Sequence, residues 1–167
     1  MSLRQTRPSP ADQAGGQAGE DLDVVVAGAH GGAGTSTLAA LLPALWDLGS
    51  IGPLLEFDRP PLQARGRPVV LAVRNTAVAA KDATTAIGAL ADWDERVAAL
   101  AIVSDGGPES REATARFALL EGRRVGGVVR VPHVRALRLV EDPSQVVLPG
   151  KARQALDELR RLADGRA

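Results

Sequence analysis

One segment near the start of the chain combines glycines and hydroxyl side chains at a spacing that suits the binding of an anion. Its members are Gly28, Gly31, Gly32, Gly34, Thr35, Ser36 and Thr37. Glycine allows a positive φ and lets the backbone approach a ligand closely. Hydroxyls, and the backbone amides that begin a helix, donate hydrogen bonds to phosphate oxygens. The segment is therefore predicted to be a phosphate-binding loop.

The residues on either side of this loop predict a strand before it and a helix after it. Residues 24–27 are apolar and mostly β-branched, which is typical of a strand covered on both faces. We expect a helix over residues 35–48, with Trp46 packed in the core and Gly49 at the C-terminal end. A strand, a glycine-rich turn and a helix in this order form the layout of a P-loop.

The loop departs from the standard P-loop pattern at the first glycine and at the lysine. That pattern has a glycine, four further residues, a glycine, a lysine, and then serine or threonine. Gly34 and Ser36 fit the end of the pattern, whereas Ala29 and Thr35 stand at the positions of the first glycine and the lysine. The frame of the loop is thus present without its positive charge.

Residues 30–37, with the sequence His-Gly-Gly-Ala-Gly-Thr-Ser-Thr, resemble the variant loop Lys-Gly-Gly-Val-Gly-Lys-Thr-Thr of the ParA/MinD-type ATPases. Every glycine and the last two hydroxyl residues match, while His30 and Thr35 replace the two lysines. The resemblance implies ATP or ADP with Mg²⁺ as the ligand, and Ser36 as a magnesium ligand. The nucleotide-binding residues that it implies are Gly31, Gly32, Gly34, Thr35, Ser36 and Thr37.

The order of the later segments also resembles that family, over about residues 22–165. Residues 69–76, with an alanine-rich helix after them, resemble the strand and helix that follow the family's Walker B region. Residues 100–105 resemble the strand whose end contacts the base. Residues 128–132 resemble the strand that ends in proline near the adenine.

The chain is short for an active member of the family, and this leaves two alignments open for residues 54–61. In one alignment these residues match the Walker B strand, and Asp58 is the carboxylate on the metal side. In the other they match an earlier strand, and Glu56 takes the catalytic position. Either way, one acidic element of the family is missing or displaced.

Apolar runs alternate with helical patterns along the rest of the chain. Further strands are expected at residues 69–73, 97–103 and 125–131, with a weaker candidate at 52–58. Helices are expected at residues 77–93, 108–121 and 133–140, and from 149 onward. The predicted fold class is α/β, a Rossmann-like P-loop fold with a mostly parallel sheet of about five strands flanked by helices.

In such sheets ligands bind at the C-terminal ends of the strands, so the loops at that edge are expected to meet. These loops span residues 28–37, 58–61, 74–76, 104–107 and 132–134.

Composition narrows the function classes. The 167 residues carry a formal net charge of zero, so bulk electrostatics gives no strong nucleic-acid signal. There is no cysteine, which excludes disulfides and thiolate metal sites. The sequence has no signal-peptide pattern and no apolar run of about 18 residues, so we expect a cytoplasmic protein without a membrane span. Residues 1–20 predict a disordered N-terminal arm, and residues 21–167 predict a single P-loop-like α/β domain.

The replacement of both lysines decides what the loop is expected to do. A P-loop lysine brings a full positive charge to the β/γ-phosphates, whereas Thr35 offers a neutral hydroxyl. A hydrogen bond to a charged group contributes about 1.5–3 kcal/mol, so we expect weaker triphosphate binding. Phosphoryl transfer should suffer more, because charge builds up in the transition state. The substitute cations considered are Arg59, Arg74 and Lys81.

Three functions remain open from the sequence. The favoured hypothesis is a degenerate ParA/MinD-like pseudo-ATPase, not an enzyme, that acts as an interaction module with a protein partner or as a homodimer. A conjugation, secretion or partition assembly is the setting that the resemblance implies. The alternative is a weak nucleotide-binding switch or slow ATPase that uses the glycine loop. The third is an unrelated Rossmann-like enzyme that binds another anion at the same helix end.

Overall fold

Parallel strands form a single five-stranded sheet in the computed structural model, which describes residues 22–122 and 124–165. The strand order is β2-β1-β3-β4-β5. The strands are β1 (Leu22–Gly28), β2 (Ala44–Ser50), β3 (Val69–Arg74), β4 (Val97–Val103) and β5 (Val128–Val131). The α-helices are α1 (Thr35–Leu41), α2 (Ala77–Asp92), α3 (Arg111–Ala118) and α4 (Gly150–Ala163). Short 3₁₀ helices are η1 (Gly52–Leu54), η2 (Arg135–Arg138) and η3 (Pro143–Gln145).

This architecture confirms the predicted α/β class with helices flanking a parallel sheet. The predicted N-terminal arm, residues 1–20, lies outside the described residues. Within the described ranges, no helix is both long enough and apolar enough to cross a membrane.

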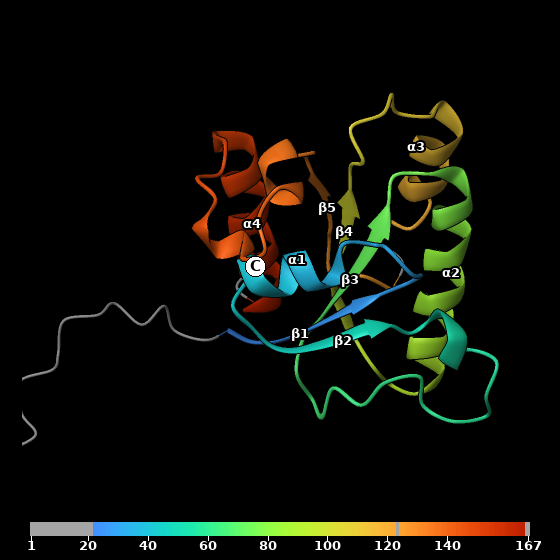
Figure 1. The fold of residues 1–167 in the computed structure, drawn as a ribbon. Coiled ribbons are helices and arrows are strands. Elements are labelled where there is room, and N and C mark those ends of the chain that lie inside the picture. Colours follow the sequence, from blue (N-terminus) through green and yellow to red (C-terminus); the bar gives the residue numbers. More distant parts are fainter. Residues whose placement is uncertain (1–21, 123, 166–167) are drawn as a thin grey trace, which may run out of the picture.

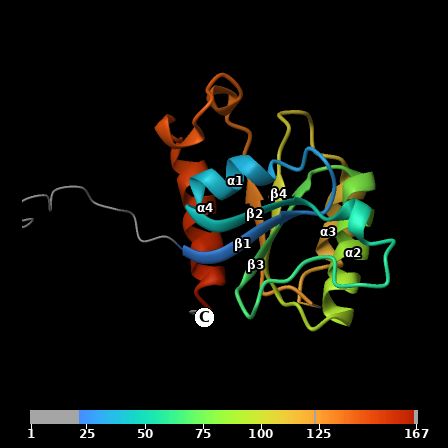
Figure 2. The same cartoon turned by 60° about the horizontal axis from the view of Figure 1, so that its bottom comes forward.

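Helices cover both faces of the sheet (Figure 1), and α1 and α4 lie on the side opposite to α2 and α3 in both ribbon views (Figure 2). Successive side chains of a strand point to opposite faces, so β1 contributes to two separate cores. Val25 and Ala27 belong to the core beneath α2 and α3, and Val24 and Val26 belong to the core beneath α1 and α4. The uninterrupted apolar runs of the sequence reflect this burial on both faces.

The strand order creates a point where the direction of connection reverses. β1 lies between β2 and β3, so the chain moves from β1 to one neighbour and then crosses over to the other. In open α/β sheets, the crevice at the carboxyl ends of such strands is the usual place for a ligand. The glycine loop that follows β1 lies at this position.

The helix predicted over residues 35–48 is wrong in its second half. The helix α1 ends at Leu41, and residues 44–50 form the edge strand β2, paired in parallel with β1. Pro43 explains the end of the helix, because proline lacks the amide hydrogen and its ring collides with the carbonyl one turn earlier. Trp46 is half-buried on the strand, with the Arg67 guanidinium 4.6 Å from the centre of its ring.

The weak strand predicted over residues 52–58 is also wrong. This segment consists of the 3₁₀ helix η1 followed by turns. Pro53 has no amide hydrogen to offer to a sheet and suits the first turn of a short helix. The segment therefore does not supply a Walker B strand, and Asp58 does not stand at a strand end.

Three other boundaries differ from the prediction. The helix expected from residue 108 begins only at Arg111, where the Ser110 hydroxyl accepts a hydrogen bond from the Ala113 amide at 3.4 Å. The helix expected over residues 133–140 is limited to η2. The last strand begins at Val128, because Gly126 and Gly127 interrupt the strand pattern.

Candidate functional site

The glycine loop borders two cavities at the C-terminal edge of the sheet. The first, called here the loop cavity, has a volume of about 330 Å³. It is lined by His30, Gly32, Ala33, Gly34, Thr35, Ser36, Thr37, Gly49 and Ser50. All the predicted nucleotide-binding residues except Gly31 are in this lining. Gly49 and Ser50 come from the end of β2. The sequence pattern did not place them at the site, because it predicts a helix for this segment.

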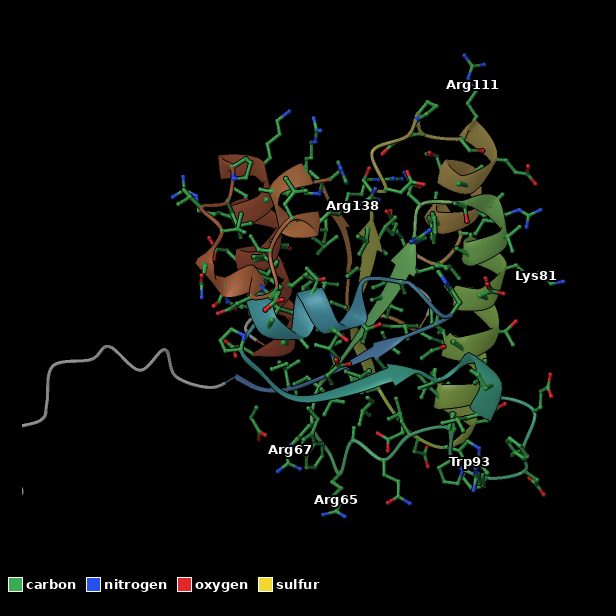
Figure 3. The ribbon with its side chains drawn as sticks, in the orientation of Figure 1. Arg65, Arg67, Lys81, Trp93, Arg111 and Arg138 are labelled. Atoms are coloured by element: carbon green, nitrogen blue, oxygen red, sulfur yellow. The ribbon has the colours of Figure 1, made fainter. Side chains whose placement is uncertain are left out.

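The second cavity, called here the arginine cavity, lies on the other side of the loop and has a volume of about 170 Å³. The strand-end loops contribute Arg74 after β3, Asp105 after β4 and His133 after β5. Arg138 of η2 closes the far side, and Figure 3 shows this side chain near the ends of β4 and β5. The meeting of strand-end loops predicted from the sequence is thus confirmed, except that residues 58–61 line neither cavity.

His30 is tied to the protein backbone through both ring nitrogens. Its Nε2 accepts a hydrogen bond from the Arg74 backbone amide at 3.1 Å, and its Nδ1 lies 2.9 Å from the Gly31 carbonyl oxygen. A carbonyl oxygen only accepts, so Nδ1 must carry the hydrogen and Nε2 must be free of one. These contacts fit a neutral ring that links the loop to β3, rather than a cation directed at a ligand.

Thr35 is buried, with an exposed fraction of 8%. Its Oγ1 occupies the space that a β-carbon on Gly28 would require. The hydroxyl is therefore directed back toward the base of the loop. Gly28 is the residue type that this arrangement demands, because any side chain there would displace Thr35.

Arg74 places a positive charge directly against the glycine loop. Its Nε donates a hydrogen bond to the Gly32 carbonyl oxygen at 2.7 Å. A β-carbon added to Gly32 would lie 3.6 Å from Arg74 Nη2, so the guanidinium group lies next to this glycine. Gly32 has a φ of +73°, a conformation that glycine adopts readily and other residues rarely do.

The other two substitute cations considered from the sequence lie elsewhere. The Arg59 guanidinium is 4.9 Å from the centre of the Phe57 ring. Lys81 extends from the outer side of α2 (Figure 3) and lines neither cavity. Of the three candidates, only Arg74 is brought to the loop.

Asp105 balances part of the positive charge in the arginine cavity. The pKa of its carboxyl is lowered, chiefly by the hydrogen bond that the Gly107 backbone amide donates to Oδ1 at 2.9 Å, and further by Arg74 and Arg138. Arg138 Nη2 also donates to the Asp105 carbonyl oxygen at 3.3 Å. Two guanidinium groups face one carboxylate, so the cavity suits a small anion better than a cation.

The two predicted magnesium ligands are not brought together. Ser36 is exposed and lines the loop cavity, whereas Asp58 is exposed on a turn that contributes to neither cavity. Glu56, the alternative catalytic acid, lies on the same exposed turn. Among residues 22–122 and 124–165, no cluster of three histidine or acidic side chains is placed to hold a metal ion.

Arg138 is the site residue that sequence reasoning missed entirely. It belongs to no motif, and its segment pairs with no strand, so only the folded chain brings it to the glycine loop.

Comparisons of this chain with family models, with curated proteins and with solved structures give no match. The candidate site is therefore defined by the geometry of its own residues.

Proposed function

We propose that this protein is a degenerate ParA/MinD-like pseudo-ATPase, a non-catalytic interaction module built on a P-loop-like frame. The observation that carries the proposal is the direction of the two residues that replace the lysines. His30 is held by two backbone groups, and Thr35 is buried against Gly28. Neither residue presents a cation to the loop cavity, although phosphoryl transfer depends on such a charge.

Two further features support the loss of hydrolysis. The Arg74 guanidinium donates through Nε to the Gly32 carbonyl oxygen at 2.7 Å and does not line the loop cavity, so its charge lies outside that cavity. No carboxylate lines the loop cavity beside Ser36, so the described residues provide no acidic partner for a magnesium ion there. What the frame retains is a glycine loop at the carboxyl end of β1, where ligands of open α/β sheets usually bind, and this exposed position suits recognition of a partner.

The proposed role is binding to another protein in the cytoplasm, in a conjugation, secretion or partition assembly. A homodimer is the alternative form of the same role. A nucleotide bound at the glycine loop acts as a ligand and not as a substrate.

The test of the proposal is release of phosphate from millimolar ATP and GTP in the presence of magnesium. We expect the wild-type chain and the Ser36→Ala variant to release phosphate at the same background rate. With His30 and Thr35 in place of the two lysines, the loop has no positive charge to stabilise the transition state. Steady turnover by the wild-type chain that Ser36→Ala abolishes would contradict the proposal. A rate that both proteins share identifies a contaminating enzyme.

A weak nucleotide-binding switch is the second candidate function, and the position of Arg74 favours it. The guanidinium group lies beside Gly32 and lines the arginine cavity together with Arg138 and Thr37. A charge-assisted hydrogen bond from arginine to phosphate is about twice as strong as a neutral one. Arg74 would thus supply from β3 the charge that Thr35 cannot supply from the loop.

Thermal unfolding with ATP, ADP, GTP and GDP, each with magnesium, tests the switch. A ligand at 100 times its Kd adds about 2.7 kcal/mol of stability, which raises the unfolding midpoint by several degrees. The switch hypothesis expects Arg74→Ala to remove this rise and Arg111→Ala to preserve it, since Arg111 lies at the outer end of α3 (Figure 3). No shift with any nucleotide eliminates the switch and leaves the interaction module.

A further inference from the structure

A groove between α2 and the C-terminal end of α3, with the turn that follows α3, is a separate surface feature that shares no residue with the two loop cavities. It has a volume of about 560 Å³. Its floor is apolar and consists of Ala80, Ile87 and Leu120, with exposed fractions of 1%, 5% and 9%. Leu119 stands at the edge of the groove with 70% of its surface exposed. An exposed leucine beside an apolar floor is typical of a surface that contacts another molecule.

The hydroxyl groups in the walls of the groove already donate hydrogen bonds within the protein. Thr84 and Thr85 line the groove, and each hydroxyl donates to a carbonyl oxygen of its own helix. The acceptors are the carbonyls of Ala80 at 2.9 Å and Lys81 at 3.2 Å. The two threonine hydroxyls of the groove therefore already have hydrogen-bond partners, and an apolar occupant leaves neither of them unpaired.

The rim of the groove is positively charged. Among the described residues that line it, Lys81, Arg116 and Arg124 are cationic and none is acidic. Arg116 is partly neutralised, because it pairs with Glu112 at 2.7 Å and donates to the Ala77 carbonyl oxygen. Lys81 and Arg124 form no ion pair with any residue in the described ranges. Two cations thus remain available on the rim.

We propose that this groove is the docking site for an acidic amphipathic helix of a partner protein. A helix laid between α2 and α3 presents apolar side chains at intervals of three and four residues, which is the spacing that fits a groove between two helices. Its apolar side covers Leu119 and the floor, and its carboxylates meet Lys81 and Arg124. Charge complementarity of this kind selects the partner and its orientation. The inference rests on the proposed interaction module and assigns the surface that it uses.

The experiment uses the full chain and a fluorescein-labelled synthetic peptide, with leucines on one side of the helix and glutamates on the flanks. Fluorescence anisotropy should show saturable binding that weakens as salt rises. Leu119→Asp and the double variant Lys81→Glu/Arg124→Glu should each weaken binding at least tenfold. The same peptide with lysine in place of glutamate should bind at least tenfold more weakly to the wild-type chain.

Leu139→Asp is the matched control. Leu139 is 76% exposed and does not line the groove, so this variant should bind the peptide like the wild-type chain. Circular dichroism of each variant checks the fold. Since Leu119 is mostly exposed, its replacement should not disturb the fold.

Several results would overturn the inference. These are an absence of saturable binding, equal affinity for the glutamate and lysine peptides, and affinity unchanged by Leu119→Asp. A dimer in sedimentation that Leu119→Asp dissociates would identify a second copy of the chain as the occupant. Binding to phosphatidylglycerol vesicles through the same residues would identify a membrane surface. The phosphate-release assay is independent of all these readings, so failure of the groove and failure of the pseudo-ATPase proposal are distinguishable.

Discussion

Replacing Phe117 with alanine is expected to lower the free energy of unfolding by about 3–5 kcal/mol, the usual cost of removing a buried phenylalanine side chain. Phe117 is 1% exposed and belongs to the core between the sheet and the helices α2 and α3. The loss combines the transfer free energy of the ring with the cavity that remains. For a chain of this size, the midpoint of thermal unfolding should fall by roughly 6–20 °C.

Phe57→Ala is the matched control, because the chain has only two phenylalanines and they differ in burial. Phe57 is 56% exposed and its ring packs against the Arg59 guanidinium. Loss of an exposed cation–π contact costs about 0.5–1 kcal/mol. Equal effects of the two alanine substitutions in urea unfolding, followed by tryptophan fluorescence, would contradict the assigned core. Phe117→Leu should fall between the wild-type chain and Phe117→Ala.

The second large effect is expected at Gly126, just before β5. A β-carbon at this position would lie within van der Waals overlap of the Ala98 carbonyl oxygen, and 3.2 Å from the Ala98 carbonyl carbon. Both are backbone atoms of β4, which lies between β3 and β5, so they cannot rotate out of the way. Gly126→Ala should therefore destabilise the fold by about 1–3 kcal/mol, the range for overpacking. It should also displace the strand that leads to His133 in the arginine cavity.

Two other glycines serve as controls for this prediction. Gly88 lies inside α2, and beyond its chain neighbours and the backbone of its own helix no atom lies within 4 Å of an added β-carbon. Gly88→Ala should therefore stabilise the chain by about 0.5–1 kcal/mol through helix propensity. At Gly127 the added atom would lie 2.7 Å from Leu162 Cδ1, a side-chain end that can move. Gly127→Ala should therefore cost less than Gly126→Ala. A neutral Gly126→Ala in urea unfolding would show that β5 does not approach β4 as described.

The candidate site was only partly predictable from the sequence, as a comparison of the glycine loop with Arg74 shows. The glycine loop was identified from residues adjacent in sequence, since a β-strand, a run of glycines and a helix start form one local pattern. Arg74 was named as one of three possible substitute cations, but the sequence could not rank them. Which cation reaches the loop depends on the order of strands in the sheet. Because β3 lies beside β1, the residue that ends β3 meets Gly32.

Local sequence determined the buried strands β1, β3 and β4, because burial on both faces requires uninterrupted apolar runs and these were visible in the chain. It also determined α2, and the start of α4, to within one residue, from their apolar periodicity. Only the tertiary structure decided that residues 44–50 form an edge strand and not a helix, because a strand is stabilised by pairing with distant residues. The same holds for the exposed position of Asp58 and for the basic groove between α2 and α3, since both depend on how separate elements pack together.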